Sequence, residues 1–76
     1  MKLIGIIGAM EVEVASLKEM MTDVTLRTKA SMEFNHGYLN GKEVVVVRSG
    51  IGKVNAGICT QILVDDYGVD CVINTG

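Results

Sequence analysis

Two glutamates stand immediately after an apolar stretch of this chain. Glu11 and Glu13 follow the apolar run 2–8 and the residue Met10 in the segment GIIGAMEVE. A carboxylate beside an apolar side chain in a crevice is suited to general-base chemistry, because desolvation raises its pKa toward neutrality. Acidic residues are also favoured in the first turn of a helix, by about 0.3–1 kcal/mol, for purely electrostatic reasons. The spacing of the two glutamates leaves both interpretations open.

A second candidate stretch is the glycine-containing segment Ser49–Lys53, which reads SGIGK. It differs from the dinucleotide-binding fingerprint because Asn55 stands at the position of the third glycine. It differs from the Walker loop because Val47 stands at the first glycine and Val54 at the hydroxyl residue. Glycines still let the backbone approach a small ligand closely. The segment is therefore either a ligand-binding turn or a plain connection between a strand and a helix.

The composition argues against several other classes of function. The net charge is −2 and the basic residues are scattered, so the chain lacks an electrostatic footprint for nucleic acid. It has no secretory signal pattern and no apolar run of about 18 residues, so we expect a cytoplasmic protein with no membrane partner. Cys59, Cys71 and the single histidine, His36, do not form a metal-ligand pattern. We therefore expect buried, reduced cysteines, no metal and no cofactor.

The periodicity of the apolar residues predicts strands alternating with helices. Strands are expected over residues 2–8, 25–32, 33–39, 44–47 and 69–75, and helices over residues 11–22 and 53–66. This order predicts a layered α/β/α fold with a mixed sheet.

Local signals refine this arrangement. Asn40-Gly41 is a strong hairpin signal, and Gly68 is expected to cap the end of the second helix. The run Val44–Val47 is β-branched and is expected to form a central strand. The strands on either side of a break near residues 31–33 are moderately polar, which favours a position near a sheet edge.

Single side chains outside these segments are expected to be structural. His36 has no partner that the sequence suggests and is expected to be a surface or strand residue, while Lys42 and Glu43 flank a turn. Met20, Met21 and Met32 are expected to pack in the core, as flexible methionines usually do.

Three motifs at their present separations resemble one enzyme family. They are GIIGAMEVEV at 5–14, LNGKEVVVVRSGIGKVNAG at 39–57 and VINTG at 72–76. Together they are similar to the N-terminal third of the 5′-methylthioadenosine/S-adenosylhomocysteine nucleosidases, which belong to the purine nucleoside phosphorylase superfamily. The resemblance implies a nucleoside phosphorylase-like fold, a nucleoside substrate and a homodimer. It also implies hydrolysis of the N-glycosidic bond with release of adenine, in methionine and purine salvage.

The resemblance also implies roles for three residues. Glu13, in the pattern Met-x-x-Glu, matches the family glutamate that activates water. Met10 matches an apolar residue near the ribose and the 5′-alkylthio group, and Ile51 matches a residue that packs against the alkylthio side of the pocket. On this basis Glu13 is the expected catalytic base and Glu11 an ordinary first-turn acid.

The resemblance covers residues 1–76 as the N-terminal part of a single nucleosidase domain without an internal boundary. In the family, a serine-containing loop, a glutamate that binds the ribose hydroxyls and an aspartate that protonates adenine come after this region. We therefore expect the 76-residue chain to be inactive by itself, truncated after the strand 69–75. Its apolar content of 49% and the unpaired edge of that strand favour covering by more chain or self-association.

Two alternatives remain beside hydrolysis. The chain is a non-catalytic, self-assembling module if its apolar strands and helices matter more than Glu13. It belongs to a phosphate-dependent nucleoside phosphorylase if Arg48 and Lys53 hold phosphate, although the Met-x-x-Glu pattern favours water. The preference between the two nucleosides depends on residues beyond position 76.

Overall fold

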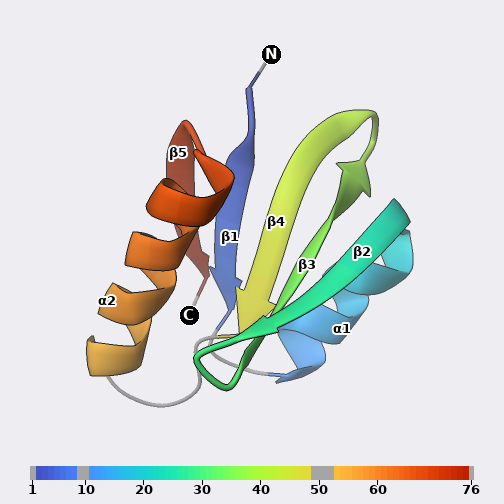
Figure 1. Ribbon diagram of the computed structural model, residues 1–76. Helices are drawn as coiled ribbons and strands as arrows, with labels where there is room; N and C mark the ends of the chain where they lie inside the picture. The colour runs from blue at the N-terminus through green and yellow to red at the C-terminus, as the bar shows by residue number, and fades with distance from the viewer. Residues whose placement is uncertain (1, 9–10, 49–52, 76) are drawn as a thin grey trace.

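The computed structural model describes residues 2–8, 11–48 and 53–75, which form one mixed sheet and two helices (Figure 1). The elements in chain order are β1 (Ile4–Gly8), α1 (Glu11–Met20), β2 (Met21–Lys29), β3 (Met32–Leu39), β4 (Lys42–Arg48), α2 (Lys53–Ile62), the π-helical turn η1 (Leu63–Tyr67) and β5 (Cys71–Thr75). The spatial order of the strands is β2-β3-β4-β1-β5. The strand β1 is parallel to β4 and β5, and β3 is antiparallel to β2 and β4. The predicted element order and layered fold are therefore confirmed.

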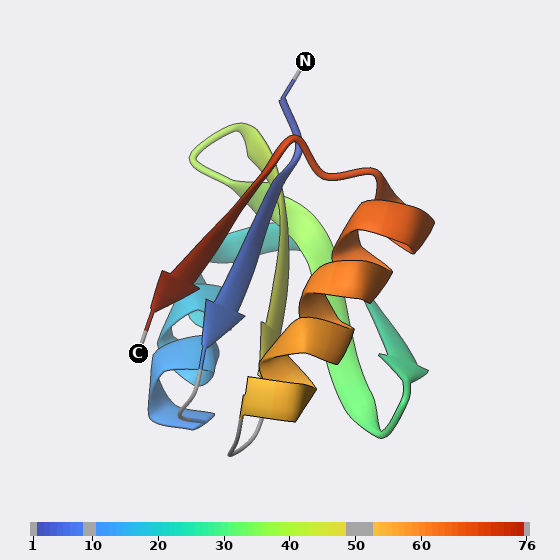
Figure 2. The same ribbon diagram turned by 90° about the vertical axis from the view of Figure 1, so that its left-hand side faces the viewer.

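The two helices cover opposite faces of the sheet (Figure 2). On one face, Cys59 of α2 and Leu63 of η1 join a buried cluster with Ile7, Val45 and other apolar residues. On the other face, Val14 of α1 packs with a second buried cluster. Central strands that contact a helix layer on each side must be apolar on both faces, which explains the continuous Ile and Val runs of β1 and β4.

The boundary between α1 and β2 differs from the prediction. The helix ends at Met20 rather than Thr22, and β2 begins at once with Met21, whose side chain is buried. The chain is then irregular: Asp23 has a φ of 54°, and the pairing of β2 with β3 shifts between Thr22 and Thr25. The irregular segment fits because Gly37 lies beneath it. A Cβ atom at Gly37 would lie 2.8 Å from the carbonyl oxygen of Thr22.

Both hairpins turn through pairs of residues with positive φ. Asn40 and Gly41 have φ values of 52° and 79°, which confirms the predicted hairpin. The other turn is Ala30-Ser31, with φ values of 53° and 64°, and not the predicted break at residues 31–33. The strand β2 lies at the sheet edge as expected, whereas β3 is interior, between β2 and β4. Its polar composition misled the prediction because one of its polar residues, Asn35, is buried.

The second helix changes its winding before it ends. The α-helix stops at Ile62 and continues as the π-turn η1, which the predicted helix 53–66 did not distinguish. Gly68 has a φ of 65° and caps the turn through hydrogen bonds to the carbonyls of Leu63 and Val64, so the predicted cap is confirmed. The last strand starts at Cys71, two residues later than predicted. Asp70 instead binds Leu3 twice, through its backbone N–H at 2.7 Å and its carboxylate at 2.8 Å.

Candidate functional site

The parallel strands β4, β1 and β5 end on the same side of the sheet, and this side, the carboxyl edge, is the candidate site. The register pairs Gly8 of β1 with Arg48 of β4 on one side and with Thr75 of β5 on the other. The carboxyl ends of all three strands therefore lie side by side (Figure 2). In open α/β sheets, ligands bind in the crevice beyond the carboxyl ends of the strands. This edge is where the connections from β1 to α1 and from β4 to α2 begin.

The three site residues predicted from the sequence belong to these connections or follow them. Met10 stands between β1 and α1, and Ile51 between β4 and α2, but both lie outside the described residues. Glu13 is the third residue of α1, in its first turn, and α1 begins at Glu11. The side chains of the two glutamates also lie outside the described part. The backbone thus brings the start of α1 to the carboxyl end of β1, and the roles of Glu13, Met10 and Ile51 stay predictions.

The first turn of α1 is anchored by the residue that follows Glu13. Val14 is buried and packs in a cluster with Ile6 of β1 and Val46 of β4. Val12, on a different side of the helix, is 72% exposed. Because Val14 is held against two central strands, the backbone position of Glu13 relative to β1 is set by apolar packing.

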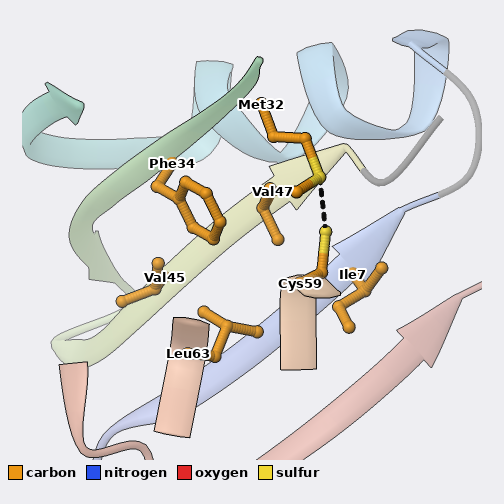
Figure 3. Close-up of a cluster of buried hydrophobic side chains, with 7 residues drawn as sticks. All are labelled: Ile7, Met32, Phe34, Val45, Val47, Cys59 and Leu63. Carbon is orange, nitrogen blue, oxygen red and sulfur yellow. Dashed lines mark hydrogen bonds between the residues drawn. The ribbon is translucent and has the colours of Figure 1, made fainter. Parts of the chain in front are cut away.

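On the face that α2 covers, buried side chains pack near the carboxyl ends of β1 and β4. Figure 3 shows Cys59 of α2 facing Met32 of β3, with Ile7 and Val47 beside them. The thiol of Cys59 donates to the sulfur of Met32 at 2.9 Å. Burial raises the pKa of the Cys59 thiol, which keeps it protonated and unreactive. Sequence reasoning missed this contact because it joins residues 27 positions apart through the fold.

The methionines and cysteines divide into buried and exposed members. Met21 and Met32 are buried as predicted, but Met20 is 61% exposed, so the prediction for Met20 was wrong. Met20 ends α1 on the side away from the sheet, while the next residue turns inward as the first residue of β2. Both cysteines are free, and Cys71 is half-buried rather than fully buried.

His36 has a partner that the sequence did not suggest. Its Nε2 atom lies 2.6 Å from the Glu43 carboxylate, and its ring contacts the edge of Tyr67 at a centroid distance of 5.8 Å. The register explains the pairing: Glu43 lies opposite Tyr38 and Val45 opposite His36, so both members of the pair project from the same face. Glu43 therefore does more than flank a turn, and the alternation of side chains along the hairpin would have indicated this.

The described part of the chain offers no metal centre and no membrane span. None of its groups of His, Cys, Asp and Glu side chains could hold a metal ion. No helix within residues 2–8, 11–48 and 53–75 is long and apolar enough to cross a membrane. The described backbone instead places the start of α1, with its two glutamates, beside the carboxyl end of β1.

Nearly the whole of this sequence matches a known superfamily. Residues 3–76 match the family described as the Phosphorylase superfamily, and the chain belongs to it.

Within that superfamily, several similar proteins share one name. A 5′-methylthioadenosine/S-adenosylhomocysteine nucleosidase of Shewanella loihica is 59% identical over 73 residues, which cover 96% of this chain and 32% of that protein. The nucleosidase of Colwellia psychrerythraea, solved in complex with adenine, superposes with a TM-score of 0.94 at 53% identity, over 99% of this chain and 31% of that one. The nucleosidase of Neisseria meningitidis in complex with methylthio-immucillin-A gives a TM-score of 0.94 at 43% identity, over 100% and 33%. The chain spans about a third of the length of the curated relatives that it matches.

Proposed function

We propose that the protein carrying this chain hydrolyses the N-glycosidic bond of 5′-methylthioadenosine and S-adenosylhomocysteine and releases adenine. The observation that carries the proposal is an identity of 59% and 60% with nucleosidases of this name over 96% of the chain. The carboxyl ends of β4, β1 and β5, which lie in register at Gly8, support it, since such folds bind small ligands beyond the carboxyl ends of their strands.

In the proposed reaction, Glu13 acts as the general base. The oxygen of a water molecule forms a bond to the anomeric carbon of the ribose, while the bond from that carbon to adenine breaks and its electron pair leaves with adenine. Glu13 takes a proton from the attacking water, and an acid outside residues 1–76 protonates adenine at N7. General-base assistance of this kind contributes about 10²–10⁴-fold in rate. The residue needs no metal or cofactor for this role.

Met10 and Ile51 are the proposed substrate-binding residues. Both belong to connections that leave the carboxyl edge, one on the β1 side and one on the β4 side. Two apolar residues in these connections suit a 5′-thioether, which gains affinity by leaving water. They also suit a base such as Glu13, because nearby apolar groups favour the neutral carboxyl.

The chain forms one wall of the proposed site. We infer that residues 1–76 are the N-terminal part of a single catalytic domain in a cytoplasmic homodimer. The groups that bind the ribose hydroxyls and protonate adenine belong, in this proposal, to the part of the relatives that this chain does not span. The 76-residue chain alone is accordingly expected to release no adenine from methylthioadenosine.

Replacing Glu13 tests the proposal directly. We expect Glu13→Gln in the full-length protein to lower the rate of adenine release by about 10²–10⁴-fold, because the amide cannot accept the proton of water. The matched control is Glu11→Gln in the same helical turn, which should retain most of the activity. Adenine release is followed with methylthioadenosine as substrate, and thermal unfolding checks that both variants fold.

Two results would reject parts of the assignment. Equal rates for the Glu13 and Glu11 variants would remove Glu13 from the catalytic role. A reaction that requires inorganic phosphate and yields ribose 1-phosphate derivatives would replace hydrolysis by phosphorolysis.

A further inference from the structure

A cavity of about 310 Å³ opens at the β2 edge of the sheet, on the face that α2 covers. Its lining residues come from the end of β2 and from η1: Arg27, Thr28, Lys29, Asp66 and Tyr67. Arg27 lies opposite Phe34 in the ladder, and Phe34 belongs to the cluster beneath α2. The volume is at the lower end of the range for small-molecule sites, which suits a small ligand.

The charges of the lining do not balance. Lys29 pairs with the carboxylate of Asp66 across the cavity. Arg27 has no hydrogen bond or ion pair within the described part of the chain, so one positive charge remains without a counter-ion. A guanidinium group offers two parallel N–H donors, which match the oxygens of a phosphoryl group.

One wall of the cavity is already held in place. The ring of Tyr67 stacks on Phe34 at a centroid distance of 5.8 Å with 25° between the planes. Its other neighbour is the ring of His36, which is fixed in turn by Glu43 at 2.6 Å. Phe34 is fully buried, so Tyr67 lies on a rigid support. A ligand therefore loses little affinity to the ordering of this wall.

We propose that this cavity binds the phosphoryl group of a small phosphate ester. The fork of Arg27 and the ammonium group of Lys29 bind the phosphoryl oxygens, and the organic part of the ester occupies the rest of the cavity beside Tyr67. Asp66 opposes the ligand, because its carboxylate repels the phosphoryl charge and competes for Lys29. Since β3 and β4 separate this edge from β1, the site does not depend on Glu13 or on the proposed nucleosidase activity.

Substitutions of Arg27 and of Asp66 are expected to change the affinity for the ester in opposite directions, which makes the test specific. The isotopically labelled protein is titrated with glycerol 3-phosphate, inorganic phosphate and glycerol while backbone amide shifts are recorded. We expect glycerol 3-phosphate to shift the amides of residues 27–29 and 66–67 with a dissociation constant of about 1 mM or lower. Glycerol should have no effect. The binding should weaken as salt is added, as for any exposed charge pair.

Substitutions at three positions separate the site from general charge effects. Arg27→Ala should weaken binding by about tenfold or more, and Arg27→Lys should lie between Ala and the wild type, because it keeps the charge and loses the fork. Asp66→Asn should tighten binding severalfold. Lys42→Ala, which removes an exposed cation at the start of β4, is the matched control and should leave binding unchanged.

Each outcome decides for or against the site. Equal affinity for inorganic phosphate supports the phosphoryl site and identifies free phosphate as the ligand. Absence of shifts at residues 27–29 and 66–67 with about 10 mM ester rejects it, since that concentration exceeds the expected dissociation constant. Weakening by Asp66→Asn, or an equal loss in Lys42→Ala, also rejects it.

Discussion

The two faces of the sheet are packed to different degrees. On the α2 face, Phe34, Cys59 and Leu63 are completely inaccessible to solvent, and they interlock with the Val side chains of β4. On the α1 face, Val46 is equally inaccessible, but Ile6, Val14 and Met21 each keep a small exposed fraction, as only Met32 does in the α2-face cluster to a similar degree. The α1 side chains Val12 and Met20 point to solvent.

The α1 face also buries an amide that is only half satisfied. Asn35 donates from its Nδ2 atom to the carbonyl of Val46 at 3.2 Å, but its Oδ1 atom has no partner within the described residues. A buried acceptor without a partner costs about 1–3 kcal/mol. The buried acceptor without a partner thus lies on the face covered by α1, the helix that carries the proposed base. Functional elements are commonly found in the less stable parts of a fold.

The same substitution on each face tests this difference. We expect Leu63→Ala on the α2 face to lower the free energy of unfolding by about 3–5 kcal/mol, because it leaves a cavity under a fully buried site. Leu17→Ala on the α1 face should cost about half as much or less, since Leu17 is only partly buried beside its cluster. Urea unfolding of both variants measures the two losses.

Equal losses would show that the faces are equally packed. If Leu63→Ala fails to fold, the milder Leu63→Met keeps the comparison measurable, with an expected loss below about 1.5 kcal/mol.

Two glycines provide a second comparison between the faces. Gly37 faces α1, where an added Cβ atom would lie 2.8 Å from a backbone carbonyl, so Gly37→Ala should destabilise the protein by about 1–3 kcal/mol. Gly57, in the middle of α2, is exposed with nothing within 4 Å, so Gly57→Ala should stabilise it by about 0.5–1 kcal/mol. Thermal unfolding gives the sign of each change, and a Gly37→Ala variant as stable as the wild type would contradict the close approach of Thr22.

The sequence was sufficient for features that depend on neighbouring residues. The Val run of β4, the Asn40-Gly41 turn and the Gly68 cap each follow from local chemistry, and each was predicted correctly. The end of α1 was predicted incorrectly because Met20 and Met21 both fit a helical stripe. Only the sheet, with Gly37 beneath Thr22, draws Met21 into a strand.

The candidate site was less accessible to sequence reasoning. The edge itself follows from the order of strands and helices, which the apolar periodicity predicted. The roles of Glu13, Met10 and Ile51 came from resemblance, because a first-turn acid and a catalytic base have the same spacing. The pairing of His36 with Glu43 follows from the register of the predicted Asn40-Gly41 hairpin, whereas the contact of Cys59 with Met32 depends on helix packing, which single segments do not encode.

The smallest expected effect is a pH dependence of the free energy of unfolding, which arises from the Cys59 thiol on the α2 face. Burial raises the pKa of Cys59 above the ordinary value of 9.0, so the folded protein retains this proton at a pH where the unfolded chain has released it. The stabilisation from the neutral buried thiol is complete below pH 9.0 and is lost as the pH rises through the folded pKa. The loss amounts to about 1.4 kcal/mol for each unit by which the pKa is raised.

Comparison with Cys59→Ala isolates this contribution, because the other groups that titrate at alkaline pH are common to both proteins. Urea unfolding at a pH of about 8 and of about 10, on either side of the ordinary thiol pKa, gives the change for each protein. The wild type should lose more stability than Cys59→Ala over this interval. Equal losses would mean that water reaches the thiol, and the α2 face would then be no better sealed than the face that carries Glu13.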